Sequence, residues 1–288
     1  MLKKLYYSDL KRQSKVLSLV CAVLIAYTAV SLLIPHNSQS IIIVLLISAV
    51  FTYLVSLVFQ IYLIIDYYKT MYSDQGVLTN MLPIGTGNVV FTKCMALFSS
   101  MLVFSLIQFI LTSIISYTLL QSLNALGEAD YELIYSIISF YTLPNLPLWF
   151  IFASLVQIVC QSFFVAAFVV CIVSLANLPV FKRFMIVALI AFAVLFSIVT
   201  VFLIVLGYQI PFGISQEIIY DEKSMPLAYG DIRLTRDLSY WGIINNSNES
   251  SIPETLTFPF VPYAIMFIFS IILLTASIYT AAHKLRLK

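Results

Sequence analysis

Six long stretches of the chain contain no Asp, Glu, Lys or Arg, and each is long enough to cross a lipid bilayer as a helix. A crossing helix needs about 20 mostly apolar residues, because each residue adds about 1.5 Å and the hydrocarbon layer is about 30 Å thick. The stretches cover residues 16–34, 41–65, 94–120, 146–176, 184–208 and 258–282. The sequence therefore predicts an all-α integral membrane protein, with residues 1–288 forming one domain of six transmembrane helices.

The composition supports the membrane prediction. Apolar residues make up 61% of the chain and charged residues only 10%, and the mean hydropathy is +1.02. A soluble domain carries about 25% charged residues, because its surface faces water. No succession of short segments with alternating hydrophobicity indicates a transmembrane barrel. An ordinary soluble domain is therefore excluded, and helices are expected.

The basic residues predict the orientation of the chain, because cytoplasmic loops carry an excess of Lys and Arg. Twelve of the 15 basic residues lie on one side of the predicted spans: Lys3, Lys4, Lys11, Arg12, Lys15, Lys69, Lys93, Lys182, Arg183, Lys284, Arg286 and Lys288. Only Lys223, Arg233 and Arg236 lie on the other side. We therefore expect a multi-pass membrane protein with both termini in the cytoplasm. The membrane we expect is the plasma membrane of a bacterial cell.

Three segments outside the spans have a distinct composition. Residues 1–15 place Leu2, Leu5, Tyr6 and Leu10 near one helical face, which favours an amphipathic helix on the inner membrane surface. The alternative is a basic topology signal with no further role. Residues 66–93 form a long cytoplasmic connection, and residues 209–257 form a large acidic extracellular loop. A loop that long usually has structure or function of its own.

The residues that would support catalysis or metal binding on this chain are missing. The four cysteines, Cys21, Cys94, Cys160 and Cys171, lie within or at the edge of the spans without zinc-site spacing, and we expect them to be free apolar core residues. No nucleotide-binding P-loop pattern occurs. We therefore expect no catalytic residue, metal site or cofactor on this chain, and no enzyme activity of its own.

The predicted spans contain uncharged polar residues only, such as Gln60, Gln108, Gln157 and Gln161. Carriers that are driven by protons or ions usually keep ionisable residues at membrane depth. The sequence therefore predicts that any uphill transport draws its energy from an ATPase on a separate chain.

The connection between the second and third spans carries a distinctive pattern. Its apolar residues are spaced as on one face of a short helix: Val77, Leu78, Met81 and Leu82. Gly76 permits a turn before this segment, and Pro83 ends it. Apolar residues on a cytoplasmic loop indicate that the segment docks into a partner.

The full pattern, Asp74-x-Gly76-x-Leu78-Thr79-x-x-Leu82-Pro83, resembles the connection between spans two and three in the permease subunits of type-2 ABC exporters. The resemblance implies that Asp74, Gly76, Val77, Leu78, Met81, Leu82 and Pro83 form a coupling helix in a groove of the ATPase subunit. Relatives often carry Ser-Arg or Thr-Arg after the proline, whereas this chain continues with 84–87, Ile-Gly-Thr-Gly. A basic contact to the ATPase would then be either missing or supplied elsewhere, by Lys69 or Lys93.

A weak echo of this pattern occurs in the other cytoplasmic connection, where Asn177-Leu178-Pro179 parallels Met81-Leu82-Pro83. With Lys182 and Arg183 it is the candidate for a second coupling loop.

The resemblance implies a complex in which this chain pairs with a second permease copy or homologue and with two ATPase subunits. ATP and Mg²⁺ would bind to those subunits, and the spans would expel an amphipathic substrate, either a peptide or a lipid-like compound, from the cytoplasm. Peptide export is the leading expectation. Two alternatives remain: a non-transporting membrane sensor or assembly protein that binds a partner through its outer loop, and an intramembrane enzyme, which the lack of acid and base residues at depth disfavours.

Overall fold

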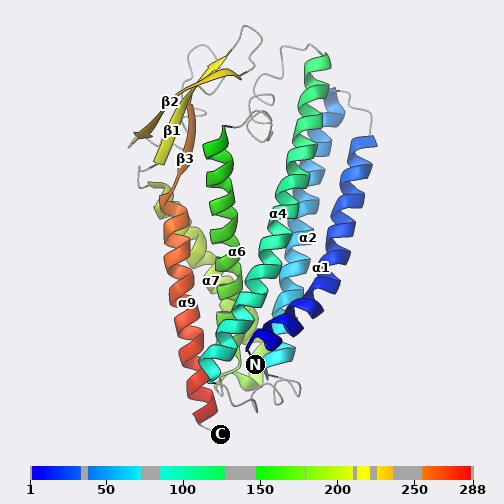
Figure 1. Ribbon diagram of the computed structural model, residues 1–288. Helices are drawn as coiled ribbons and strands as arrows, with labels where there is room; N and C mark the ends of the chain where they lie inside the picture. The colour runs from blue at the N-terminus through cyan, green and yellow to red at the C-terminus, as the bar shows by residue number, and fades with distance from the viewer. Residues whose placement is uncertain are drawn as a thin grey trace.

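The computed structural model describes residues 2–33, 38–72, 85–126, 147–178, 180–209, 213–220, 226–235 and 255–286. Six long helices form the body of the molecule (Figure 1). They are α1 (Leu2–Leu33), α2 (Ser38–Tyr72), α4 (Thr86–Leu126), α6 (Leu148–Ala176), α7 (Met185–Gln209) and α9 (Val261–Arg286). A short 3-10 helix, η3 (Lys182–Phe184), precedes α7. All six contain a segment long and apolar enough to cross a membrane, so the described part of the chain has the predicted number of candidate spans.

Three of the helices extend well beyond the apolar stretches that predicted them. The sequence predicted a separate helix over residues 1–15. Instead, α1 is continuous from Leu2 to Leu33. No Gly or Pro occurs between these two residues to break the backbone. Residues 66–72 belong to α2 and residues 86–93 to α4, which shortens the predicted cytoplasmic connection from both sides. The change from apolar to charged residues does not end these helices.

The last three helices lie close to their predicted bounds, and capping residues are seen at both ends of α6. Pro147 caps the start of α6 with φ −63° and ψ 145°, an extended conformation that suits a residue outside the helix. At the other end of α6 the side-chain amide of Asn177 donates to the Val173 carbonyl at 2.8 Å. Helix α9 starts three residues later than predicted, since residues up to Pro259 belong to a strand.

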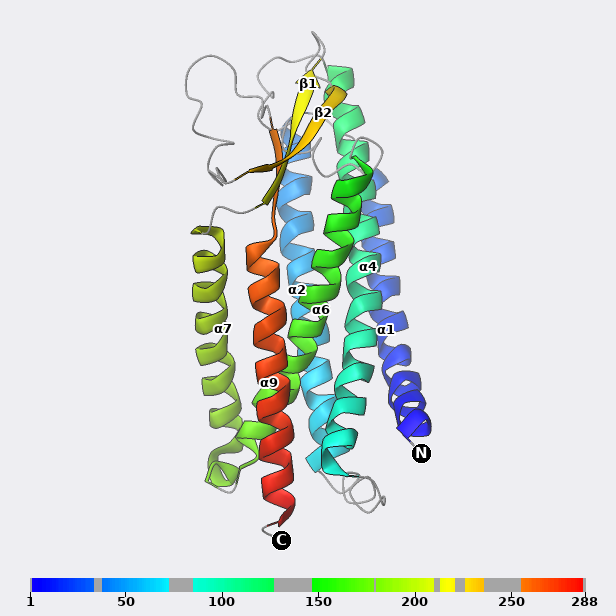
Figure 2. The ribbon, with the colours of Figure 1, turned by 60° about the vertical axis from the view of Figure 1, so that its left-hand side comes forward.

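Helix α4 lies in the middle of the bundle and contacts α1, α2, α6 and α9. The core between these helices holds large, fully buried side chains, among them Phe59 of α2 and Phe104 of α4, whose ring centroids are 4.9 Å apart. Helix α7 lies at the edge, against α6 and α9 (Figure 2). Its buried Gly207 permits a close approach to α9, because a Cβ there would lie 2.9 Å from the Pro262 Cα.

A small antiparallel sheet caps one end of the bundle, where the sequence predicted a loop. Its strands are β1 (Gly213–Tyr220), β2 (Pro226–Thr235) and β3 (Thr255–Pro259), in the order β2-β1-β3. Phe258 of β3 is 4% exposed and packs against Phe150 of α6 and Tyr263 of α9, with ring centroids 5.9 and 5.4 Å apart. The all-α prediction therefore holds for the spans and fails for this outer part.

The sheet and the cytoplasmic segments predicted from the sequence lie at opposite ends of the bundle (Figures 1 and 2). Helix α1 starts, α2 ends, α4 starts and α9 ends at the end far from the sheet, which we call the foot of the bundle. The sequence predicted that these four helix ends share one side of the membrane, and the structure agrees. The predicted assignment of the foot to the cytoplasm stays a prediction.

Candidate functional site

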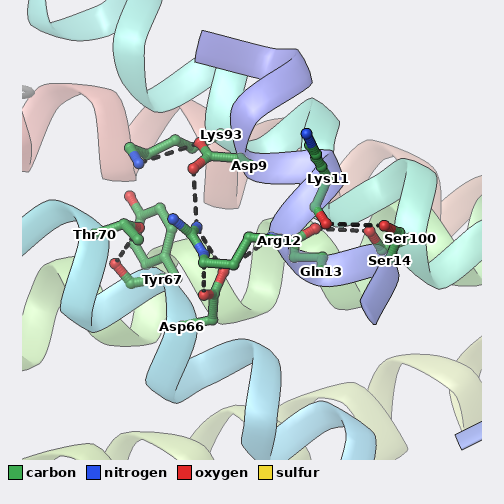
Figure 3. Close-up of polar contacts among 10 residues, drawn as sticks. All are labelled: Asp9, Lys11, Arg12, Gln13, Ser14, Asp66, Tyr67, Thr70, Lys93 and Ser100. Atoms are coloured by element: carbon green, nitrogen blue, oxygen red, sulfur yellow. Dashed lines mark hydrogen bonds and ion pairs between the residues drawn. The ribbon is translucent and has the colours of Figure 1, made fainter. Parts of the chain in front are cut away.

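Four charged side chains meet near the foot of the bundle and connect three helices (Figure 3). We call Asp9 and Arg12 of α1, Asp66 of α2 and Lys93 of α4 the ionic cluster. Arg12 faces Asp66 with two hydrogen bonds, from Nε to Oδ1 at 2.7 Å and from Nη2 to Oδ2 at 3.0 Å. Asp9 accepts from Arg12 Nη2 at 2.9 Å and from Lys93 Nζ at 3.2 Å. Arg12 and Asp9 each therefore have two partners of opposite charge.

Three of these side chains are nearly inaccessible. The exposed fractions are 3% for Lys93, 6% for Asp9 and 7% for Asp66, whereas Arg12 is 38% exposed. Two acids and two bases leave the ionic cluster without net charge. Such a balance is needed, because a buried charge without a partner costs several kcal/mol of desolvation.

An amide side chain completes the polar network. Gln13 Nε2 donates to Asp66 Oδ2 at 3.1 Å, and Gln13 Oε1 accepts from Ser100 Oγ of α4 at 2.6 Å. Two turns earlier in α1, the Tyr6 hydroxyl lies 2.8 Å from Ser99 Oγ of α4. Gln13 and Ser100 are 2% and 1% exposed. The first four turns of α1 are thus attached to α4 by neutral hydrogen bonds as well as by charge.

The ionic cluster lies close to the connection that carries the family-like pattern. Asp66 is six residues before Tyr72, where α2 ends, and Lys93 is seven residues after Thr86, where α4 begins. At about 1.5 Å per residue, both side chains stand about 10 Å from the helix ends. The two helices that flank residues 73–84 are therefore tied to each other through α1.

The sequence did not predict the ionic cluster. It predicted that buried polar residues are uncharged, and this is wrong for Asp9, Asp66 and Lys93. The predicted use of Lys93 as a basic contact to a partner conflicts with its burial and its bond to Asp9. Asp66 and Lys93 lie next to an apolar stretch and Asp9 lies seven residues before one, so hydropathy assigned all three to water. Only the packing of α1 against α2 and α4 brings the charges together.

The predicted coupling segment, from Asp74 to Pro83, lies outside the described residues. In the second predicted coupling loop, Asn177 is 6% exposed and serves as a cap of α6, so its side chain does not face a partner. Leu178 follows this cap and is half-buried, and Lys182 belongs to η3. Arg183 is exposed, with its guanidinium carbon 5.7 Å from the centroid of the Phe184 ring. Pro179 is outside the described residues.

The cysteines behave as the sequence predicted. All four are free thiols, and Cys21, Cys94 and Cys171 are buried while Cys160 is half-buried. Among the residues that the structure describes, no three His, Cys, Asp or Glu side chains gather as a metal site would require.

No family model, no curated protein and no solved structure matches the chain. Its function is therefore inferred from its residues and from the geometry of the bundle.

Proposed function

We propose that this chain is the membrane subunit of an ATP-driven exporter of the type-2 ABC class. The observation that carries the proposal is the pattern from Asp74 to Pro83, which resembles the coupling segment of those permeases. The segment joins the end of α2 at Tyr72 to the start of α4 at Thr86, and both helix ends are at the foot of the bundle (Figure 1).

The ionic cluster supports a mechanical role for this connection. A force on residues 73–84 acts on the ends of α2 and α4, which the cluster joins to α1 through Asp66 and Lys93. Paired charges in an apolar interior hold one arrangement of helices more strictly than apolar contacts do, since a shift leaves a charge without its partner. Three spans would therefore move together when the partner ATPase closes on ATP.

The proposed assembly contains two permease chains and two ATPase subunits, and the latter carry ATP and Mg²⁺. The proposed substrate is an amphipathic peptide or a lipid-like compound that leaves the cytoplasm through the spans. The acids of the outer segment favour a substrate with positive charge: residues 209–257 hold seven acids and three basic residues. Peptide export is the leading assignment.

The structured outer sheet favours a second candidate function. A three-stranded sheet anchored on α6 and α9 could bind a partner outside the membrane, as a sensor or an assembly protein would. Its strand β2 lies at the edge of the sheet, and the side chain of Leu234 on that strand is 73% exposed. An edge strand offers unpaired backbone groups for strand addition.

The test is whether an ATPase accompanies the protein. The tagged full-length chain is purified from its native membranes in a mild detergent, and hydrolysis of Mg-ATP by the sample is measured with and without vanadate. We expect vanadate-sensitive hydrolysis that is lost in Leu78→Asp and in Leu82→Asp. Each change places an unpaired charge in the proposed groove, where desolvation costs several kcal/mol, and each 1.4 kcal/mol is a tenfold loss of affinity.

The matched control is Ser14→Asp, which adds the same charge at an exposed position near the foot of the bundle. This variant should keep its ATPase. A wild-type sample without associated ATPase would contradict the exporter and favour the sensor. Retention of the ATPase by both leucine variants would move the contact away from the pattern.

A further inference from the structure

Three lysines of the first turns of α1 share one exposed face. Lys3, Lys4, Tyr7, Ser8 and Lys11 line a shallow hollow of about 670 Å³ on the outside of the molecule. All five are exposed, and Tyr7 is 65% exposed. Counted from Lys3, the other four residues follow after one, four, five and eight positions, which keeps all five on one side of a helix. No acidic residue lines the hollow.

The opposite face of the same turns is held against the bundle, which fixes the direction of the lysines. Asp9 and Gln13 are buried in contacts with α2 and α4, and Leu5 packs against the core. Lys11 points away from the ionic cluster, as Figure 3 shows. The predicted apolar face of residues 1–15 is therefore turned partly toward α4, and the basic face is presented outward.

The length of the apolar part of α1 predicts that the hollow lies at the depth of lipid headgroups. The apolar part of α1 covers residues 16–33, about 27 Å at 1.5 Å per residue, which matches a hydrocarbon layer of about 30 Å. Lys11 stands five residues before this part, about 7 Å from its start. In Figure 1 the first turns run obliquely to the rest of α1, so these turns lie nearer to this depth than they would in a straight helix.

We infer that this lysine face binds the phosphate of an anionic phospholipid headgroup. The lysine ammonium groups supply charge and hydrogen bonds to phosphate oxygens, and the Tyr7 and Ser8 hydroxyls can donate further hydrogen bonds. A tyrosine at this level is typical of membrane–water interfaces. Because the ionic cluster orients the helix, bound lipid would stabilise the docked position of the first turns of α1. The inference does not depend on the proposed transport function.

The experiment titrates fluorescently labelled phosphatidylglycerol into the full-length protein in a neutral detergent. The triple variant Lys3→Gln/Lys4→Gln/Lys11→Gln should bind about a hundredfold more weakly, since each lysine near an anionic lipid surface contributes roughly fivefold. The matching triple arginine variant should keep most of the affinity. The control Lys284→Gln/Arg286→Gln/Lys288→Gln removes the same charge from the C-terminal residues and should change affinity less than twofold.

Three results would overturn the inference. An unchanged affinity in the glutamine variant would show that the hollow binds no lipid. An equal loss in the C-terminal variant would show that only overall charge matters. Displacement of the labelled lipid by inorganic phosphate as effectively as by unlabelled phosphatidylglycerol would show that the site takes a soluble phosphate ligand. Unlabelled phosphatidylcholine should displace little, because its headgroup carries no net charge.

Discussion

Lys93 and Asp9 illustrate how a pair of residues can be essential to one arrangement and still contribute little net stability. Lys93 is 3% exposed and its ammonium group lies 3.2 Å from the Asp9 carboxylate. Bringing both ions out of water costs about as much as their attraction returns. Removal of one partner is different, because the other charge stays buried.

At the scale of single residues, we predict that Lys93→Met destabilises the protein by about 3 kcal/mol. This is the lower end of the range for a broken buried pair, because Asp9 keeps its contact with Arg12. Adding Asp9→Asn removes the surplus negative charge. The double variant should therefore be more stable than Lys93→Met alone, by about 1–2 kcal/mol. The measurement is the free energy of unfolding in mixed detergent micelles.

Lys15→Met is the matched control, because Lys15 is exposed on α1. It should change the free energy of unfolding by no more than about 0.5 kcal/mol. If Lys93→Met is as harmless as this control, or if the second change adds its own full cost, Lys93 and Asp9 are not a buried pair.

Among the elements, α1 departs most from the sequence prediction. A surface helix followed by a separate span was expected, and the structure has one helix of 32 residues. The change in composition near Val16 marks the depth of the hydrocarbon layer and does not interrupt the backbone hydrogen bonds. Continuity matters, because it connects the ionic cluster to the apolar part of α1 through one hydrogen-bonded helix.

We predict that Lys15→Pro strongly destabilises the protein. Within a continuous helix a proline removes the bond to the carbonyl four residues earlier and clashes with it, at a cost of about 3 kcal/mol or more. At a natural break between two helices, the same change would be tolerated. The melting temperature of the purified protein should fall well below that of Lys15→Ala, which removes the same side chain without a proline. Equal melting temperatures would favour the two-helix arrangement.

On the scale of the whole molecule, the two ends of the bundle differ in kind. The sheet stands at one end, and the first turns of α1, the end of α2 and the start of α4 lie at the other (Figures 1 and 2). The asymmetry of 12 basic residues against three predicts that the foot faces the cytoplasm.

We predict that single cysteines report this orientation. In a chain whose four native cysteines are replaced, Asp231→Cys on the exposed surface of β2 should react with an impermeant maleimide added to intact cells. Gly85→Cys and Arg183→Cys are exposed at the foot and should react only after the membrane is opened. The measurement is the fraction labelled in each case. Labelling of the two foot positions in intact cells would reverse the orientation.

The sequence by itself determined the number, the type and the approximate position of the spans. Uncharged apolar stretches of this length satisfy their backbone hydrogen bonds in a bilayer only as helices or closed barrels, and no barrel pattern is present. It also determined that the cysteines are free and that the start of α1 and the end of α9 share one side. These properties follow from local composition, which needs no knowledge of which helix lies beside which.

Only the tertiary structure decided where the charges go. Asp9 and Asp66 are 57 residues apart in the chain, and Lys93 is 27 residues beyond Asp66. Hydropathy placed each of them in water beside a span, whereas the packing of α1 against α2 and α4 buries them together. The outer sheet escaped prediction for a related reason: the pairing of β1 with β3 joins segments separated by a long connection. Contacts between distant segments depend on how helices and strands pack, and a single sequence does not show this packing.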